Sequence, residues 1–255
     1  MGAGHGHLLY RHERSLLHDI APQCKLAAQL GFVLAVVATP REAFWAFGLY
    51  ALVMVGLAAT ARIPVRFMVT RLGFELPFVA FAAFLPFVGG GPRTSVAGLA
   101  LSVEGLWAAW NILAKATLGM GAAIVVGATT TVPDLLAGLE RLHLPRPLVA
   151  IATFMVRYAE VIAGEMKRMS IARRSRCHDP RWLWQARAVA ATSGALFIRS
   201  YERGERVWLA MRSRGYDGSM PLLGSGAAPA GQWMASMAVP AVAVVVAIAS
   251  WTVMR

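Results

Sequence analysis

The last part of the chain, residues 233–254, reads WMASMAVPAVAVVVAIASWTVM and holds no acidic or basic side chain. A helix needs roughly 20 mainly apolar residues to cross the hydrocarbon core of a bilayer, which is about 30 Å thick. Four earlier stretches are also mainly apolar: 24–39, which is short, 43–60, 72–88, and a long one within 96–131. Because spanning helices satisfy their own backbone groups in lipid, these stretches predict an all-α integral membrane protein with about five transmembrane helices.

The composition agrees with a membrane location. Charged residues make up 15% of the chain, whereas soluble domains carry about 25%. The net charge of +12 would suggest nucleic acid as the partner of a soluble protein, but in a membrane protein it indicates a cytoplasmic surplus of Arg and Lys. We therefore expect the lipid bilayer, and no nucleic acid, as a partner. Cys24 and Cys177 lie far apart with no CxxC spacing, which predicts neither a disulfide framework nor a thiolate metal site.

Two segments depart from a simple apolar span. Residues 148–163, LVAIATFMVRYAEVIA, are apolar, but Arg157 and Glu160 interrupt them, so we predict an amphipathic or interfacial helix there. Prolines at positions 77 and 86 predict a kink or a break in the third span, where neighbouring helices must satisfy the freed carbonyls.

The distribution of basic residues predicts the orientation. With the N-terminus inside, nearly all of the 25 Lys and Arg residues fall on one side of the membrane, and only Arg41, Arg93 and Arg255 fall on the other, with Lys115 inside the fourth span. Cytoplasmic loops carry the excess of Lys and Arg, so the N-terminus is predicted to be cytoplasmic. The predicted domains are a four-span membrane domain (1–131), a cytoplasmic helical insert (132–232) and the last span (233–255).

The insert is predicted to be helical. The sequence T-V-P-D-L-L at 131–136 indicates a helix start with an acidic residue in the first turn, and HLPRP at 143–147 ends that helix. A second helix is predicted from 148 to about 175, followed by a turn at CHDP. A third is predicted from about 181 to 213, and it ends where glycines provide C-terminal punctuation, at Gly215 and Gly218.

A short motif occurs twice in the insert, as ARRSRC at 172–177 and AMRSRG at 210–215. Both copies lie at predicted helix C-termini, where arginine complements the negative end of the helix dipole. The small residues beside the last arginine would also let a helix tip enter a partner's groove while the guanidinium reaches a carboxylate. Anchoring to anionic lipid is a further interpretation. The candidate residues are Ala172, Ser175, Arg176, Cys177, Ala210, Ser213, Arg214 and Gly215.

These motifs lie in stretches that resemble a known family. Residues 129–177, TTTVPDLLAGLERLHLPRPLVAIATFMVRYAEVIAGEMKRMSIARRSRC, resemble the transmembrane (T) component of energy-coupling-factor transporters. Residues 199–218, RSYERGERVWLAMRSRGYDG, are similar to its cobalt-type branch, the CbiQ/EcfT family, and LHDIAPQCKL at 17–26 resembles the family's start. The resemblance implies a non-catalytic subunit of a bacterial inner-membrane importer for cobalt or nickel ions, or for a vitamin if the module is shared. It also implies two ATP-binding-cassette ATPase subunits and a separate substrate-binding membrane subunit as partners, and no cofactor.

The resemblance also implies roles for the two motifs. In the family they end two coupling helices, each docked into a groove on one ATPase subunit, with the motif arginines, here Arg176 and Arg214, facing acidic residues. This chain departs from the usual pattern with Cys177 in place of Gly, and with Ser before each of these arginines where Ala is common. ATP binding would bring the ATPase subunits together and change the crossing angle of the two helices. The expected surface of the coupling helices also includes Arg173, Arg174, Met166, Met169 and Trp208.

Other function classes fit less well. The chain has no GxxxxGK[ST] motif, so we do not expect it to hydrolyse ATP. An alternative is a membrane enzyme acting on a phosphate-bearing lipid, with the cytoplasmic arginines as phosphate ligands. The acidic residues of the insert, however, are spaced like helix-surface partners of arginine, as Glu202 and Arg206 illustrate.

Several residues invite a functional interpretation by their type alone. The N-terminal His5, His7, His12 and His18 form a His-rich tract of a kind that can bind metal, but no carboxylate or Cys cluster completes a coordination set, so we predict no metal site. Glu75, Glu104 and Lys115 are ionisable residues in predicted spans and are functional candidates for that reason. Glu104 and Lys115 lie about three helical turns apart, too far to pair, and either can lie at the membrane interface.

Overall fold

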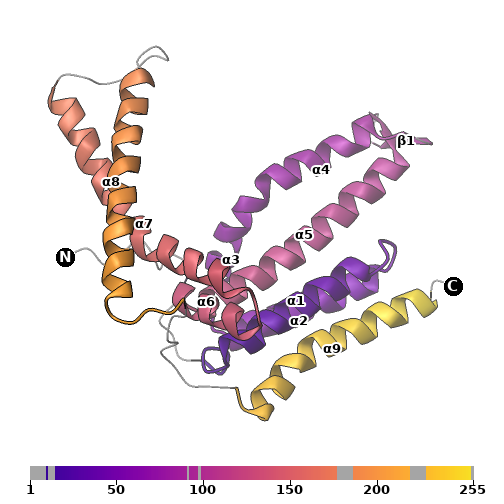
Figure 1. Cartoon of the computed structure of the whole chain (residues 1–255). Helices are drawn as coiled ribbons and strands as arrows, with labels where there is room; N and C mark the ends of the chain where they lie inside the picture. Colours follow the sequence, from indigo (N-terminus) through magenta and orange to yellow (C-terminus); the bar gives the residue numbers. More distant parts are fainter. Residues whose placement is uncertain are drawn as a thin grey trace. The chain divides into compact units, whose positions relative to one another are not determined.

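A computed structural model describes residues 10, 15–90, 92–96, 99–176, 186–218 and 228–253. The chain divides into two compact units (Figure 1). Residues 9–142 and 225–255 form the first, which we call the membrane unit, and residues 143–224 belong to the second, the insert unit. The part of the chain at 132–142, which the sequence assigns to the cytoplasmic insert, groups with the membrane unit by its contacts. The placement of each unit inside or outside the bilayer stays a prediction.

The membrane unit is almost entirely helical, as the sequence predicts. Its elements, in chain order, are α1 (Pro22–Ala38), α2 (Phe44–Thr60), α3 (Val65–Leu72), the 3₁₀ turn η1 (Gly73–Glu75), α4 (Leu76–Val88), β1 (Arg93–Val96), β2 (Leu99–Ser102), α5 (Val103–Thr129), α6 (Val132–Arg141) and α9 (Ala230–Val253). Each of the five apolar stretches contains a helix. Within the described residues, 65–88, α5 and α9 are long and apolar enough to cross a membrane, and α1 and α2 are shorter apolar helices.

Helices α1 and α9 lie side by side and run in the same direction (Figure 1). At one end the Ala21 backbone N–H donates to Oε1 of Gln232 over 2.9 Å, and at the other the Trp251 indole donates to the Ala38 carbonyl over 3.0 Å. Parallel first and last helices need an odd number of crossings from α1 to α9. The parallel direction of α1 and α9 agrees with five spans, in which the first span starts and the last span ends on opposite sides of the membrane.

The remaining helices alternate in direction around α5. Lys25 near the start of α1 contacts the last turn of α5, so these two helices are antiparallel. Phe44 at the start of α2 packs against Trp107 in the first part of α5, with ring centroids 5.6 Å apart, so α2 and α5 are parallel. Glu75, just before α4, accepts a hydrogen bond from Thr117, past the middle of α5. The start of α4 therefore lies toward the end of α5, and these two helices are antiparallel. The strictly alternating order α1, α2, α4, α5, α9 is the pattern of a chain that crosses the membrane five times.

A polar junction lies in the core of the membrane unit. The hydroxyl of Tyr50 donates to the Ala243 carbonyl over 3.0 Å and lies 2.9 Å from Oγ1 of Thr39. Tyr50 and Thr39 are both buried. These bonds connect α1, α2 and α9, and such contacts hold helices together where apolar burial gives no preference for protein over lipid.

Two local features differ from the sequence prediction. The long apolar stretch within 96–131 begins inside an antiparallel hairpin of β1 and β2, in which Arg93 pairs with Ser102, and α5 starts only at Val103. Ser102 ends the hairpin and caps α5, because its Oγ accepts the Gly105 N–H over 3.1 Å. The predicted break in the third span is present, but it lies at η1, one turn before the prolines begin; Pro77 occupies the first turn of α4 and Pro86 lies inside it.

Gly105 marks a close contact between α4 and α5. A Cβ built on Gly105 would lie 2.5 Å from the Leu85 carbonyl oxygen and 2.8 Å from Cα of Pro86. Small residues at helix interfaces let backbones approach this closely in membrane proteins. Gly119, on the same helix, has no heavy atom within 4 Å of the corresponding position.

We expect Gly105→Ala and Gly119→Ala to have opposite effects on stability. Alanine is favoured over glycine in a helix by roughly 0.5–1 kcal/mol, so Gly119→Ala should raise the unfolding midpoint slightly. Gly105→Ala must push α4 from α5 and should lower the midpoint by a larger amount, since overpacking costs about 1–3 kcal/mol. Thermal unfolding in detergent measures both. Equal midpoints for the two variants would contradict this close contact between α4 and α5.

The insert unit contains α7 (Arg146–Ser175) and α8 (Ala186–Arg212). Both helices confirm the predicted helical regions within the described residues, whereas the predicted turn at 177–180 lies outside them. The predicted start of α6 is also confirmed, because Oγ1 of Thr131 accepts the Asp134 N–H. By length and composition alone α7 is a further candidate to cross a membrane; we keep its assignment as an interfacial helix as a prediction.

Candidate interaction surface of the insert and its roots

Helices α7 and α8 form an antiparallel pair joined by side-chain contacts. The Glu165 carboxylate lies 3.0 Å from the guanidinium of Arg203 and 3.4 Å from that of Arg199. Further along the pair, Arg173 donates to Oγ1 of Thr192 over 3.5 Å. The Glu165 side chain is only 14% exposed, so the ion pairs are more shielded than those at an open surface, which contribute little. The two helices are therefore connected at two levels along their length.

The end of α8 has a well-defined cap. The Tyr216 N–H donates to the Met211 carbonyl over 3.0 Å, and the Gly215 N–H donates to the Arg212 carbonyl over 3.1 Å. This pattern is a Schellman motif, which requires a left-handed residue after the last turn. Gly215 supplies it with φ of 83°, and Gly218, further along the chain, also has a positive φ, of 102°. Arg214 consequently lies at the exposed tip of the helix.

The two copies of the repeated motif share one local geometry. The Ser175 hydroxyl donates to the Ala172 carbonyl over 3.0 Å, and the Ser213 hydroxyl donates to the Ala210 carbonyl, also over 3.0 Å. Each serine thus satisfies a carbonyl that the end of a helix leaves without a backbone partner. This bond gives the serine at each motif a structural purpose. Arg176 is exposed, like Arg214, and Cys177 lies outside the described residues.

A basic hollow of about 620 Å³ lies between α7 and α8 near the first motif. Its lining includes Arg168, Arg173, Arg176 and Arg199, together with Met169 and Ala172. Nε of Arg173 is buried and has no hydrogen-bond partner among the described residues. Arg174, next in sequence, is exposed, and Met166 is half-buried. Met169 and Arg173 therefore lie on one surface with Arg176, together with Arg168 and Arg199, and its role as a coupling-helix surface stays a prediction.

An apolar hollow of about 350 Å³ lies elsewhere between the same helices. Phe154, Met155 and Tyr158 line it from α7, and Trp208 lines it from α8. The Arg212 guanidinium lies 5.5 Å from the centroid of the Trp208 ring, a cation–π distance. Met155 is 68% exposed and Trp208 51%, so this surface is available for contact. The insert unit thus offers one basic and one apolar surface.

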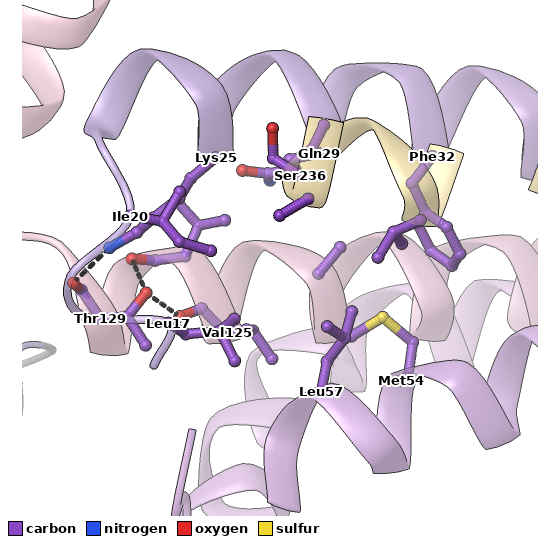
Figure 2. A pocket seen from close by; sticks show the side chains of 15 residues that line it. Leu17, Ile20, Lys25, Gln29, Phe32, Met54, Leu57, Val125, Thr129 and Ser236 are labelled. Carbon is purple, nitrogen blue, oxygen red and sulfur yellow. Dashed lines mark hydrogen bonds between the residues drawn. The ribbon is translucent and has the colours of Figure 1, made fainter. Parts of the chain in front are cut away.

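The start of α1 is a polar centre that the sequence did not reveal. Lys25 is 6% exposed, and its ammonium donates to the Thr129 carbonyl over 3.0 Å (Figure 2). The ammonium also donates to Oγ1 of Thr130 over 3.3 Å and to the His18 carbonyl over 3.4 Å. Thr129 is the last residue of α5, so Lys25 places a positive charge at the negative end of that helix dipole. The only sequence signal was its position near the start of the first apolar stretch, 24–39.

Lys115 makes the reciprocal contact. Its ammonium donates to the Val37 carbonyl over 2.8 Å, in the last turn of α1. Each of the antiparallel helices α1 and α5 therefore carries a lysine that binds the C-terminal turn of the other. Of the remaining intramembrane candidates, Glu75 is buried and accepts from Thr117 over 2.9 Å, and Glu104 lies in the first turn of α5. These contacts give Lys115 and Glu75 a packing role.

A small apolar cavity of about 170 Å³ lies beside Lys25, inside the membrane unit (Figure 2). Phe32, Met54, Leu57 and Val125 line it from α1, α2 and α5, and Ser236 lines it from α9. All three donors of the Lys25 ammonium are already used within the protein. Among the described residues that line the cavity, none therefore offers a free cation to a charged ligand.

Metal binding finds no site in the part of the chain that the structure describes. Among the described residues no group of three or more His, Cys, Asp or Glu side chains gathers as a metal site would require. His18 shares a hydrogen bond of 2.7 Å with the Ser15 hydroxyl, and His5, His7 and His12 lie outside the described residues.

The alternating apolar helices and the helical insert define a multi-pass integral membrane protein. The chain belongs to the cobalt transport protein family, CbiQ, whose profile matches residues 13–223. It is 29% identical over 209 residues to "Cobalt transport protein CbiQ" of Rhodobacter capsulatus, covering 80% of this chain and 81% of that one. It is 25% identical over 218 residues to "Energy-coupling factor transporter transmembrane protein EcfT" of Ruminiclostridium cellulolyticum, covering 80% and 81%. The protein is thus a transmembrane component of a cobalt or energy-coupling-factor transporter.

Proposed function

We propose that the chain is the energy-coupling subunit of an importer for cobalt or nickel ions, located in the bacterial inner membrane with its N-terminus in the cytoplasm. It transmits ATP-driven motion of two ATPase subunits to a separate substrate-binding membrane subunit, and it catalyses no reaction itself. The observation that carries this proposal is the repeated helix end, in which Ser175 and Ser213 make the same bond and an exposed arginine follows each. The name of the Rhodobacter capsulatus relative, a cobalt transport protein, supports cobalt as the cargo.

The mechanism assigns one task to each part of the insert. Arg176 and Arg214 bind carboxylates in the grooves of the two ATPase subunits, since guanidinium and carboxylate form strong paired hydrogen bonds. The connections between α7 and α8 through Glu165 and Arg173 let the pair move as a lever when the ATPase subunits approach one another. The apolar hollow around Met155 and Trp208 contacts the substrate-binding subunit, because Met-rich surfaces adapt to a partner that changes orientation.

A second candidate function deserves a test because of the basic hollow. Arg168, Arg173, Arg176 and Arg199 could hold the phosphate of a lipid substrate, as the enzyme hypothesis requires. The nearby Glu165, however, is engaged by two arginines and is a poor candidate for a general base. The transporter hypothesis explains both copies of the motif, whereas the enzyme hypothesis explains only the first.

The proposed function predicts that ATPase subunits purify with the chain. The tagged chain is expressed with the products of its neighbouring genes, purified from membranes, and assayed for bound ATPase protein and for ATP hydrolysis. Membrane vesicles holding the same proteins should accumulate radioactive cobalt or nickel only when ATP is supplied. Purification without any ATPase would refute the coupling function, and conversion of a phospholipid by the purified chain would favour the enzyme.

A further inference from the structure

Two segments of the membrane unit, which we call the roots, connect the chain to the insert, and both contact the start of α1. The chain enters the insert through α6 and returns from it into α9. On the entry side, Nη1 of Arg141 donates to Oε1 of Gln23 over 3.2 Å. A Cβ built on Gly138 would lie 3.0 Å from Cβ of Pro22 and from Cδ1 of Leu26. Helix α6 therefore packs closely against the first turn of α1 at Gly138.

The return root is held by one side chain. Gln232, in the first turn of α9, accepts from the Ala21 N–H over 2.9 Å and donates from Nε2 to the Asp19 carbonyl over 3.3 Å. Ala21 is the N-cap residue of α1, and its own side chain makes no capping bond. Gln232 thus satisfies a backbone donor that the start of α1 leaves free.

The same short segment also binds the end of α5. Lys25 connects the first turn of α1 to Thr129 and to the His18 carbonyl. Residues 18–25 consequently contact α5, the entry root α6 and the return root α9. We call residues 18–25, with Gly138, Arg141 and Gln232, the root clamp.

A displacement of the root clamp would pass along the whole of α1. Helices α1 and α9 stay in contact past their middle, where a Cβ on Gly31 would lie 2.9 Å from Cβ of Pro240, and as far as Trp251 and Ala38. A helix transmits movement along its axis because its backbone hydrogen bonds hold it rigid. The two parallel helices would therefore move together.

We propose that the root clamp carries the motion of the insert into α1 and α9, with Arg141 and Gln232 as positioning residues for coupling. This inference rests on the proposed function and adds a path to it: the membrane unit takes part in the movement of the substrate-binding subunit. The rival arrangement has the insert acting on that subunit directly, with the membrane unit as a passive anchor. Arg141 and Gln232 do not belong to the hydrophobic core of the membrane unit, so their removal leaves that core in place.

The experiment compares cobalt uptake with ATP hydrolysis in the same proteoliposomes, which hold the full complex. The variant Arg141→Ala/Gln232→Ala is expected to keep its ATPase subunits and its ATP hydrolysis, while cobalt taken up per ATP hydrolysed falls about tenfold, a typical size for coupling between sites. The matched control is Thr60→Ala/Thr70→Ala, whose hydroxyls bond to carbonyls of their own helices. Replacing Arg141 by Lys rather than Ala keeps a donor for Gln23 and should recover part of the cobalt taken up per ATP hydrolysed.

The outcomes separate this inference from the function on which it rests. A wild-type complex without ATPase or without cobalt and nickel uptake refutes the proposed function itself. A wild-type complex that works, beside a double variant with an unchanged uptake ratio, overturns the root clamp alone. If the double variant does not assemble, the single variants Arg141→Ala and Gln232→Ala decide: a lowered ratio in either supports the clamp, and normal ratios in both overturn it.

Discussion

The double charge reversal Arg176→Glu/Arg214→Glu is expected to remove the ATPase subunits from the purified chain. Hydrogen bonds to charged groups contribute about 1.5–3 kcal/mol each. The loss of both sites should therefore lower the affinity for the ATPase subunits at least about a hundredfold. Reversal adds repulsion from the acidic residues that each arginine is proposed to face. Both side chains are exposed helix-end residues, so their replacement should leave the fold intact.

The measurement is ATPase protein and ATP hydrolysis in eluates of the wild type and the variants. Arg187→Glu is the matched control, because Arg187 is an exposed arginine at the start of α8 and lies outside the repeated motif. It should retain the ATPase subunits. Each single reversal should weaken binding less than the pair, since one helix end remains docked. If the ATPase stays bound to the double variant, the two arginines do not dock it. Dipole complementation or lipid contact then explains both arginines instead.

Local patterns predicted the elements that local physics determines. Hydropathy located a helix in each of the five apolar stretches, because a helix that crosses a bilayer needs a run of consecutive apolar residues, which the sequence displays directly. The start of α6 at Thr131 and the end of α8 at Gly215 followed from capping preferences, which depend on a few neighbouring residues. The resemblance to the transporter family, carried by continuous stretches, is confirmed by the family match.

Features that depend on distant contacts were missed. Lys25 binds Thr129, and Gln232 binds Ala21, across separations of 104 and 211 residues, which no local pattern encodes. Lys115 looked like a functional candidate because charge is costly in a membrane, and only the partner helix shows that it binds the end of α1. The hairpin before α5 escaped because a short apolar run fits a strand as well as a helix.

The paired lysines lead to a prediction about stability. Lys25→Met keeps most of the side-chain volume and removes the ammonium from a site that is 6% exposed. The Thr129 carbonyl and the Thr130 hydroxyl, both on buried residues, then lose a charged donor, and we expect a loss of about 2–3 kcal/mol of unfolding free energy. Replacing a buried ion pair by apolar residues can be neutral when both partners are replaced, but here a helix-end carbonyl cannot be removed.

Lys115→Met is the matched comparison, since it removes the reciprocal contact at a site where the hydrogen bond is exposed. An exposed bond to a helix end is worth about 0.3–1 kcal/mol, so this variant should unfold close to the wild type in detergent. Equal midpoints for the two variants would mean that Lys25 does not hold α5 to the start of α1. Because the root clamp includes Lys25, a stable Lys25→Met protein with normal cobalt uptake per ATP would also weaken the proposed path of coupling.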